Sequence, residues 1–282
     1  MTQLALFEFE KRWANGREAW VKPPELFSPG GFAVDVVAER VARRFVEREH
    51  YAASFPAARL SVGLWGPGPS LAGVAVFSVP MSTNVLPRWT GMDHRQAVEL
   101  GRFVCAPSVK YNGESWFLVR CFRHLAREKG SRAVLSFSDP LERRTAAGAL
   151  MKRQHFGTIY QAAGALFAGR ARARWLYLAP DGSVVSDRML SKIRQGERGL
   201  DYAVARLRSY GAPQRRRGEP WADWTARVLM LPIFRRVFHP GNYAYVFGLN
   251  TPTRKAVTRL HEGGKPYPKP PPLSSLQLPL AA

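Results

Sequence analysis

The strongest constraint on the fold is an ordered run of strand and helix patterns in the first half of the chain. In chain order the predicted elements are a strand at 60–65, a strand at 71–79, a strand at 98–106, a helix at 115–129 and a strand at 133–137. The first two strands flank Gly66-Pro-Gly-Pro-Ser70, a composition typical of a hairpin connection. A hairpin that feeds a strand–helix–strand unit predicts an α/β fold, with a mixed central sheet flanked by helices.

Other segments extend this pattern on both sides. A helix is predicted at 32–48, because apolar residues recur there at three- and four-residue steps. A second helix is predicted in "GTIYQAAGALFAGRARAR" (157–174), whose middle is apolar and whose end carries three arginines. Strands at 175–178 and 183–185 flank Pro180-Asp-Gly, which indicates a hairpin, and a last strand is predicted at 243–247.

These patterns predict three segments. Residues 1–190 form a core with a catalytic site, and 191–240 form a basic helical insertion that could engage DNA. Residues 241–282 supply the last strand of the core and a proline-rich tail.

The charge of the chain points to a polyanionic partner. The formal net charge is +21, and residues 170–282 hold 20 lysines and arginines against 7 aspartates and glutamates. Double-stranded DNA is the expected partner, with contacts from Arg170, Arg172, Arg174, Arg215, Arg216 and Arg217. The alternative is a solvated, arginine-rich surface without a nucleic-acid partner.

Composition also excludes several classes. No stretch reaches the roughly 18 apolar residues of a membrane span, so no membrane partner is expected. The amino terminus lacks a basic segment followed by an apolar one, which argues against export. The chain has two cysteines, too few for a disulfide framework. A cytoplasmic location is therefore expected.

Polar residues gather at the ends of the predicted elements, where crevices form in α/β sheets. The set comprises His50, Tyr51, Glu99, Arg102, Ser115, Asp139 and Tyr160. Four of these, His50, Tyr51, Asp139 and Tyr160, could hold a metal ion such as iron or act as a proton-transfer cluster. No His-x-x-His or Cys-x-x-Cys spacing supports the metal. Glu99 and Arg102 could also form a buried ion pair.

The element order resembles the GNAT (N-acetyltransferase-like) fold, yet one of its signatures is missing. An acetyl-CoA site in that fold uses a glycine-rich loop before the helix, where backbone N–H groups hold the pyrophosphate. The matching stretch here, "APSVKYNGESWF" (106–117), has one glycine and places Glu114 where the phosphates would approach. Acetyl-CoA is therefore not expected as a cofactor.

Six stretches together resemble the Mom family of phage DNA-modification proteins. They are "EHYAASFP" (49–56), "AVELGRFVCAPSVKYNGESWFLVRCFRHL" (97–125), "SFSDP" (136–140), "HFGTIYQAAGALFAG" (155–169) and, more loosely, "NYAYVFGL" (242–249) and "PYPK" (266–269). The resemblance implies a GNAT-like fold and a transferase that converts adenine in double-stranded DNA to N6-carbamoylmethyl-adenine. Such a modification protects phage DNA from host restriction, and the enzyme works in the cytoplasm of the infected bacterium.

The resemblance also implies roles for the candidate residues. It places His50, Tyr51, Asp139 and Tyr160 around the reaction centre, while Glu99, Arg102 and Ser115 line the pocket. Asp139 or Tyr160 would manage protons or a metal, and Arg102 would orient a carboxyl- or amide-like donor group. Because adenine N6 lies inside the duplex, the base would have to flip into the pocket.

Two other functions stay open. One is a GNAT-type acyltransferase that acts on another amine, including the amine of a hypermodified base. The other is a DNA-binding protein that keeps the fold without the chemistry. A pure binder has no need to hold polar groups together at several element ends, which favours an enzyme.

Overall fold

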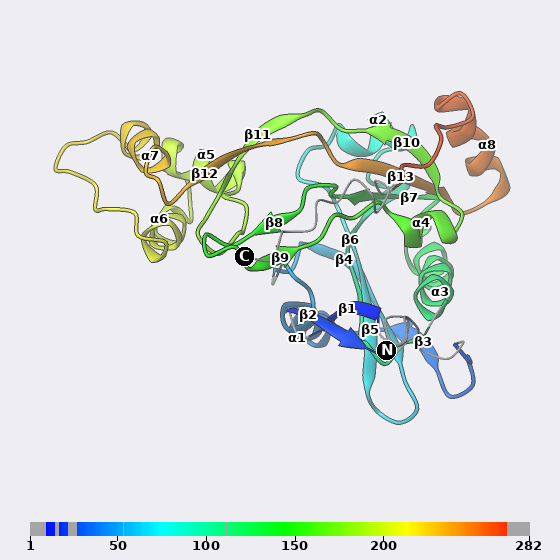
Figure 1. Cartoon of the computed structure of the whole chain (residues 1–282). Helices are drawn as coiled ribbons and strands as arrows, with labels where there is room; N and C mark the ends of the chain where they lie inside the picture. Colours follow the sequence, from blue (N-terminus) through cyan, green and yellow to red (C-terminus); the bar gives the residue numbers. More distant parts are fainter. Residues whose placement is uncertain (1–9, 15–16, 22–26, 53, 111, 270–282) are drawn as a thin grey trace, which may run out of the picture. The chain divides into compact units, whose positions relative to one another are not determined.

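A computed structural model describes residues 10–14, 17–21, 27–52, 54–110 and 112–269 of the chain. The chain divides into two compact units. Unit 1 draws on residues 1–139, 155–171 and 242–282, and unit 2 on residues 140–154 and 172–241 (Figure 1). The chain therefore leaves unit 1 twice to build unit 2.

A seven-stranded mixed sheet forms the centre of unit 1, as predicted. Its spatial order is β10-β13-β7-β6-β5-β4-β3. The strands are β3 (Ala33–Val36), β4 (Ala58–Trp65), β5 (Leu71–Ser78), β6 (Ala97–Cys105), β7 (Ala133–Ser138), β10 (Leu166–Arg170) and β13 (Tyr243–Gly248). Neighbours are antiparallel except β6 and β7, which run parallel. Unit 1 also includes a two-stranded antiparallel sheet of β1 (Glu10–Ala14) and β2 (Arg17–Val21).

Helices cover both faces of the large sheet. They are α1 (Glu39–Glu49), α2 (Val85–Thr90), α3 (Gly113–Lys129), α4 (Thr158–Ala162) and α8 (Thr251–Leu260). One face packs its apolar side chains with α3 and α4, and the other packs with α1, α2 and α8. Figure 1 shows α1 and α3 on opposite sides of the strands. No helix among the described residues is long and apolar enough to cross a membrane.

The longest helix of unit 1, α3, follows directly from its sequence. Phe117, Leu118, Cys121 and Leu125 recur on one face and are fully buried against the sheet. Each large apolar side chain of this kind contributes about 1.5–3 kcal/mol when it leaves water. The helix ends at Gly130, whose φ of 60° lets its N–H bond back to the Ala126 carbonyl. The predicted helix and its glycine stop are confirmed.

Unit 2 has its own helices, ribbons and apolar core. Its elements are β8 (Arg143–Arg144), β9 (Leu150–Lys152), β11 (Arg174–Leu178), α5 (Asp187–Gln195), α6 (Leu200–Ser209), α7 (Trp221–Leu229) and β12 (Arg235–His239). Trp224, Ile193 and Leu207 are fully buried at the centre of this unit. The strands pair as two antiparallel ribbons, β8 with β9 and β11 with β12.

The predicted helix at 157–174 is wrong over most of its length. Only α4 is helical; the chain then turns at Gly164, where φ is 77°, and continues as the edge strand β10. β10 pairs antiparallel with β13, which lies more than 70 residues further along the chain. The alanine-rich composition favours a helix locally, and this long-range pairing overrides it.

Two other predictions need correction for the same reason. The predicted helix at 32–48 begins as strand β3, which pairs with β4, and becomes helical only at Glu39. The predicted hairpin at 175–185 is reduced to a single bridge between Leu178 and Val184, because β11 pairs with the distant β12. Residues 191–240 belong to unit 2, together with 140–154 and 172–190.

Candidate active site and nucleic-acid interface

The candidate active site lies where β6 and β7 stop pairing. The two parallel strands are joined at only three positions, and the last is Glu99 opposite Leu135. Beyond this point β6 continues to Cys105 and β7 to Ser138 without pairing to each other. Glu99 and Arg102 on β6, and Ser136 on β7, therefore belong to the region where the strands diverge.

A bulge at Gly101 places Glu99 and Arg102 on the same face of the sheet. In a regular strand, residues three apart point to opposite faces. Here Glu99 pairs with Ser78 and Arg102 with Val76, so β6 has one more residue than β5 over this span. A Cβ on Gly101 would lie 2.5 Å from the Ser78 hydroxyl oxygen, which explains why the bulge needs glycine.

Glu99 and Arg102 influence each other's pKa, although the structure shows no ion pair between these two described side chains. Burial raises the pKa of the Glu99 carboxyl, and the positive charge of Arg102 partly offsets this. Burial lowers the pKa of Arg102, against the opposing effect of Tyr51 and Glu99. Arg102 Nε donates to the Ser54 carbonyl at 2.9 Å and its Nη2 to the Ser54 hydroxyl at 2.8 Å. The guanidinium is therefore held in one orientation.

Tyr160 lies in the middle of α4, is buried, and is within electrostatic range of Glu99. Burial raises the pKa of its phenol to about 12, with smaller opposing and reinforcing effects from Ser136, Tyr51, Tyr245 and Glu99. The phenol is thus protonated at neutral pH. Tyr51, at the end of α1, acts on the pKa of both Tyr160 and Arg102. Four residues selected from sequence, Tyr51, Glu99, Arg102 and Tyr160, therefore come within electrostatic range of one another.

Several neighbours of Tyr160 were missed by the sequence analysis. The His155 ring stacks on Tyr160 at 5.5 Å between centroids, and Tyr245 from β13 lies at 5.4 Å. Gln161 Nε2 donates to the Tyr245 hydroxyl at 3.1 Å and to the Phe156 carbonyl at 2.9 Å. His155 and Gln161 lie in the same quoted stretch as Tyr160. Tyr245 gives no local signal, because only the pairing of β13 with β7 brings it here.

The remaining candidate residues have different placements. Asp139 follows β7, and its backbone carbonyl accepts a 3.0 Å hydrogen bond from the His155 N–H, where the chain returns from unit 2. His50 stacks on Tyr51 at 4.3 Å, and its Nδ1 accepts from the Ala52 N–H at 3.1 Å. Ser115 lies in the first turn of α3, where its hydroxyl donates to the Asn112 carbonyl.

The predicted metal set contains one histidine, one aspartate and two tyrosines. Among the residues that the structure describes, no group of three or more His, Cys, Asp or Glu side chains could hold a metal ion. Iron binding by His50, Tyr51, Asp139 and Tyr160 stays a prediction.

The loop before α3 is packed by apolar side chains. A Cβ on Gly113 would lie 2.6 Å from Val109 Cγ1 and 2.7 Å from Phe27 Cδ2, so this glycine is enclosed by side chains. In a pyrophosphate-binding loop, glycine instead allows phosphates to approach the backbone. The packing around Gly113 therefore differs from that of a pyrophosphate-binding loop.

The predicted DNA-contacting arginines near residue 170 divide between the units. Arg170, in unit 1, lies over the Tyr243 ring at 4.8 Å and donates to its hydroxyl at 2.8 Å. Arg172 and Arg174 belong to unit 2. Both are exposed, and Arg174 forms a 3.5 Å ion pair with Asp187. These contacts do not test DNA binding.

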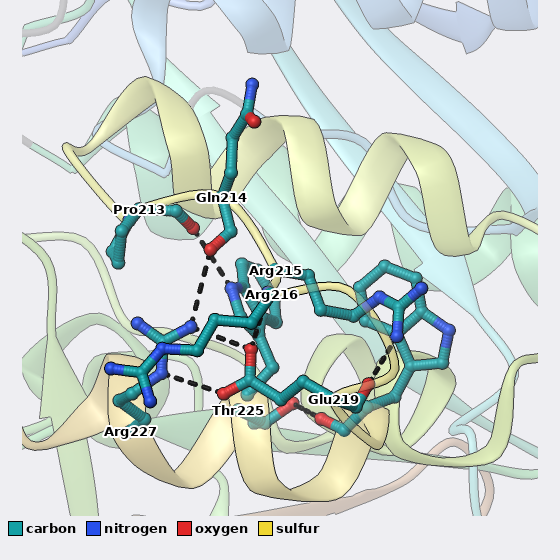
Figure 2. Close-up of polar contacts among 9 residues, drawn as sticks. Pro213, Gln214, Arg215, Arg216, Glu219, Thr225 and Arg227 are labelled. Carbon is teal, nitrogen blue, oxygen red and sulfur yellow. Dashed lines mark hydrogen bonds and ion pairs between the residues drawn. The ribbon is translucent and has the colours of Figure 1, made fainter.

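The second predicted cluster, Arg215 to Arg217, lies on a loop that is held by one glutamate (Figure 2). Both Glu219 carboxylate oxygens accept from Arg227, at 2.8 and 2.7 Å, and one also accepts from the Arg216 N–H at 2.9 Å. Arg215 donates to the Glu219 carbonyl and lies 4.6 Å from the Trp221 ring centroid. Glu219 therefore fixes the backbone while the three arginine side chains stay exposed.

Replacing Glu219 with glutamine is expected to lower the thermal stability of the protein at pH 7. The hydrogen bond from Arg227 is the main reason that the pKa of Glu219 falls to about 2, from an ordinary 4.5. A lowered folded-state pKa stabilises the fold above the ordinary value and stops doing so as the pH falls through the folded value. The gap in Tm between wild type and Glu219→Gln should narrow as the pH falls from 4.5 towards 2 in scanning calorimetry.

Glu142→Gln is the matched control, because Glu142 pairs with Arg144 in the same unit but both side chains are at least 41% exposed. Exposed pairs contribute little, so its Tm should stay within about 1 °C of wild type. Equal Tm changes in the two variants would contradict the structural role of Glu219.

The β11–β12 ribbon carries a set of residues that was not predicted. Trp175 and Phe238 are paired across the ribbon, are 53% and 54% exposed, and contact edge to face. The Arg236 guanidinium lies 4.5 Å from the Trp175 ring centroid. Unit 2 as a whole holds 18 lysines and arginines against 7 aspartates and glutamates. Exposed aromatic rings in basic surroundings suit contact with nucleic-acid bases.

Comparisons with solved structures return GNAT proteins. A tandem GNAT protein from the clavulanic acid biosynthesis pathway is 11% identical, with 80% of this chain and 86% of that chain covered and a TM-score of 0.36. A GNAT family N-acetyltransferase from Escherichia coli in complex with CoA is 14% identical, with 51% and 74% covered and a TM-score of 0.33. The ribosomal-protein-S18-alanine N-acetyltransferase from Escherichia coli is 15% identical, with 54% and 88% covered and a TM-score of 0.32.

Sequence comparison gives the family. A search of curated proteins found no match. The profile of the Mom protein family matches residues 31–269, which spans the large sheet of unit 1 and all of unit 2. The match includes every candidate site residue selected above. The chain belongs to the Mom protein family.

Proposed function

We propose that the protein is a DNA-modifying transferase that converts adenine in double-stranded DNA to N6-carbamoylmethyl-adenine and so protects phage DNA from restriction. The observation that carries the proposal is the group of Tyr51, Glu99, Arg102 and Tyr160 at the divergence of β6 and β7. Membership of the Mom family supports the same reaction.

Three residues of this group, Glu99, Arg102 and Tyr160, have a chemical task in the proposed reaction. Adenine N6 exchanges one hydrogen for a carbon substituent. As the new N–C bond forms, the bond between that carbon and the leaving group of the donor breaks, the leaving group keeps the electron pair, and a base accepts the N6 proton. Glu99 suits this task because burial raises the pKa of its carboxyl towards the working range of the enzyme. The protonated Tyr160 phenol can donate a hydrogen bond to the reacting groups, and Arg102 is held ready to orient a carboxyl- or amide-like donor.

The basic surfaces of the protein would attract double-stranded DNA, the proposed substrate. Duplex DNA carries a dense negative charge, and lysines and arginines that neutralise phosphates make binding fall steeply with salt. Arg172, Arg174 and Arg215 to Arg217 are exposed on unit 2. The target adenine would have to leave the stack to reach Tyr160, which is buried.

Mass spectrometry of nucleosides tests the proposal. Plasmid DNA from cells that express the protein should contain a deoxyadenosine about 57 Da heavier than normal, the change when CH₂CONH₂ replaces a hydrogen on the flipped base. Cells that express soluble Tyr160→Phe protein serve as the control. A mass shift on another nucleoside would instead favour an acyltransferase for a different amine. Unmodified DNA together with tight, salt-sensitive DNA binding would favour a binder without chemistry.

A further inference from the structure

A cationic pocket lies at the edge of the unit 1 sheet, outside the candidate active site. Its volume is about 310 Å³, and it is bordered by α2, by the edge strand β10 and by the end of α8. Arg88, Arg170, His261 and Lys265 line it together with apolar side chains. No aspartate or glutamate lies among its lining residues, all of which the structure describes.

The charged groups of the pocket are held in place by specific contacts. The Lys265 N–H donates to the Phe167 carbonyl at 3.0 Å, which fixes the segment after α8 along β10. Its ammonium lies over Gly169, 3.3 Å from where a Cβ would be. Arg170 is oriented by Tyr243, as described above. Like charges that converge without an acidic partner repel one another, and a bound anion removes this cost.

A second, separate cationic hollow lies along α8. This hollow has a volume of about 430 Å³ and is lined by Arg254, Lys255, Thr258, Arg259 and Gly263. Residues 254 to 261 span about 10 Å of helix axis. Glu262 is the one acidic residue between 250 and 269, and it lines neither hollow. Two cationic hollows that α8 helps to form suit a polyanion with regularly repeated charges better than they suit one small anion.

We propose that the pocket formed by Arg88, Arg170, His261 and Lys265 binds a phosphate group, and that this group belongs to the DNA backbone. Arginine presents a planar fork of donors that matches phosphate oxygens, and lysine adds a point charge. The assignment to DNA rests on the proposed function, whereas the phosphate chemistry rests on the pocket alone. Unit 1 thereby grips the duplex independently of the arginines of unit 2.

The test compares two double variants with equal changes in charge. Arg88→Gln/Lys265→Gln removes two cations from the pocket. Arg40→Gln/Arg123→Gln removes two exposed cations from α1 and α3, neither of which lines the pocket. Fluorescence anisotropy with a labelled duplex gives the affinity over a series of salt concentrations. Each lost phosphate contact should reduce the slope of log K against log salt by about one. The pocket variant loses its single phosphate, so its slope should fall by about one, and the slope of the control should fall much less.

A calorimetric titration with inorganic phosphate at constant ionic strength shows whether the bound phosphate group comes from DNA or from a small molecule. Loss of phosphate binding in the pocket variant with an unchanged DNA slope would support the phosphate site and assign it to a small phosphorylated molecule. A pocket variant that matches the control in both measurements would overturn the proposal. If wild-type protein binds no DNA and produces no modified adenine, the proposed function fails, and the phosphate titration still decides the pocket.

Discussion

Replacing Tyr160 with phenylalanine is expected to lower the rate of DNA modification by about 10²- to 10⁴-fold, the usual contribution of a positioned proton donor or acceptor. The substitution removes one oxygen from a buried ring that packs between His155 and Tyr245. The ring contacts remain, so the free energy of unfolding should change by only about 1 kcal/mol. The measurement is the amount of modified deoxyadenosine per unit of soluble protein.

The control is Tyr210→Phe in unit 2. This substitution likewise removes one phenolic hydroxyl, which in Tyr210 lies 2.9 Å from the Ser183 hydroxyl. Tyr210 lies in unit 2, outside the candidate active site. It should modify DNA at the wild-type rate. A Tyr160→Phe protein that is folded and fully active would exclude the phenol from the reaction and leave Glu99 as the remaining candidate for proton transfer.

The pH dependence separates the roles of the two groups. Tyr160 has a pKa of about 12, so it stays protonated across the physiological range and adds no titration step there. The pKa of Glu99 is raised above its ordinary 4.5, mainly by burial. Activity should therefore fall on the acidic side as Glu99 takes up a proton, with a midpoint above 4.5, when purified protein is assayed with cell extract as the source of donor.

Local patterns in the sequence were enough to predict the centre of the sheet. The hairpin of β4 and β5, the strand β6, the helix α3 and the strand β7 all depend on short-range periodicity and on turn residues such as Gly130. β10 was missed because the alanine- and glycine-rich run before it favours a helix, and only pairing with β13 makes it a strand. β11 was predicted as a strand, but its partner β12 was missed, because more than 55 residues separate the two.

The titratable residues of the candidate site could be predicted from the sequence, but the residues that surround them could not. Glu99, Arg102 and Tyr160 stand out because charged or phenolic groups interrupt apolar runs. Ser136 and Tyr245 look like ordinary strand residues, and the register of β7 against β13 alone makes them neighbours of the phenol. A bulge leaves no mark on the sequence other than a glycine, so the shared face of Glu99 and Arg102 required the structure.

Substitution of Gly101, the glycine of this bulge, is the second change expected to have a large effect on activity. Gly101→Ala is expected to lower the rate of DNA modification by about 10²-fold, because displacing a catalytic group by about 1 Å costs that much. The added Cβ would lie 2.5 Å from the Ser78 hydroxyl oxygen and 3.1 Å from Pro56 Cγ. The φ of Gly101 lies outside the left-handed region, so alanine causes crowding and no backbone strain. The free energy of unfolding should therefore fall by about 1–3 kcal/mol.

A second substitution tests whether crowding is the cause. Ser78→Gly removes the atoms that the new methyl group would meet first, so the double variant Gly101→Ala/Ser78→Gly should recover a large part of the activity that Gly101→Ala loses. Gly66→Ala is the matched control, since its Cβ would meet nothing closer than 3.7 Å, and it should keep both activity and Tm. If Gly101→Ala lowers Tm but its folded fraction modifies DNA at the wild-type rate, the bulge supports the sheet and does not position Glu99 and Arg102. If activity is lost and Ser78→Gly restores it, their shared face is a requirement of the reaction.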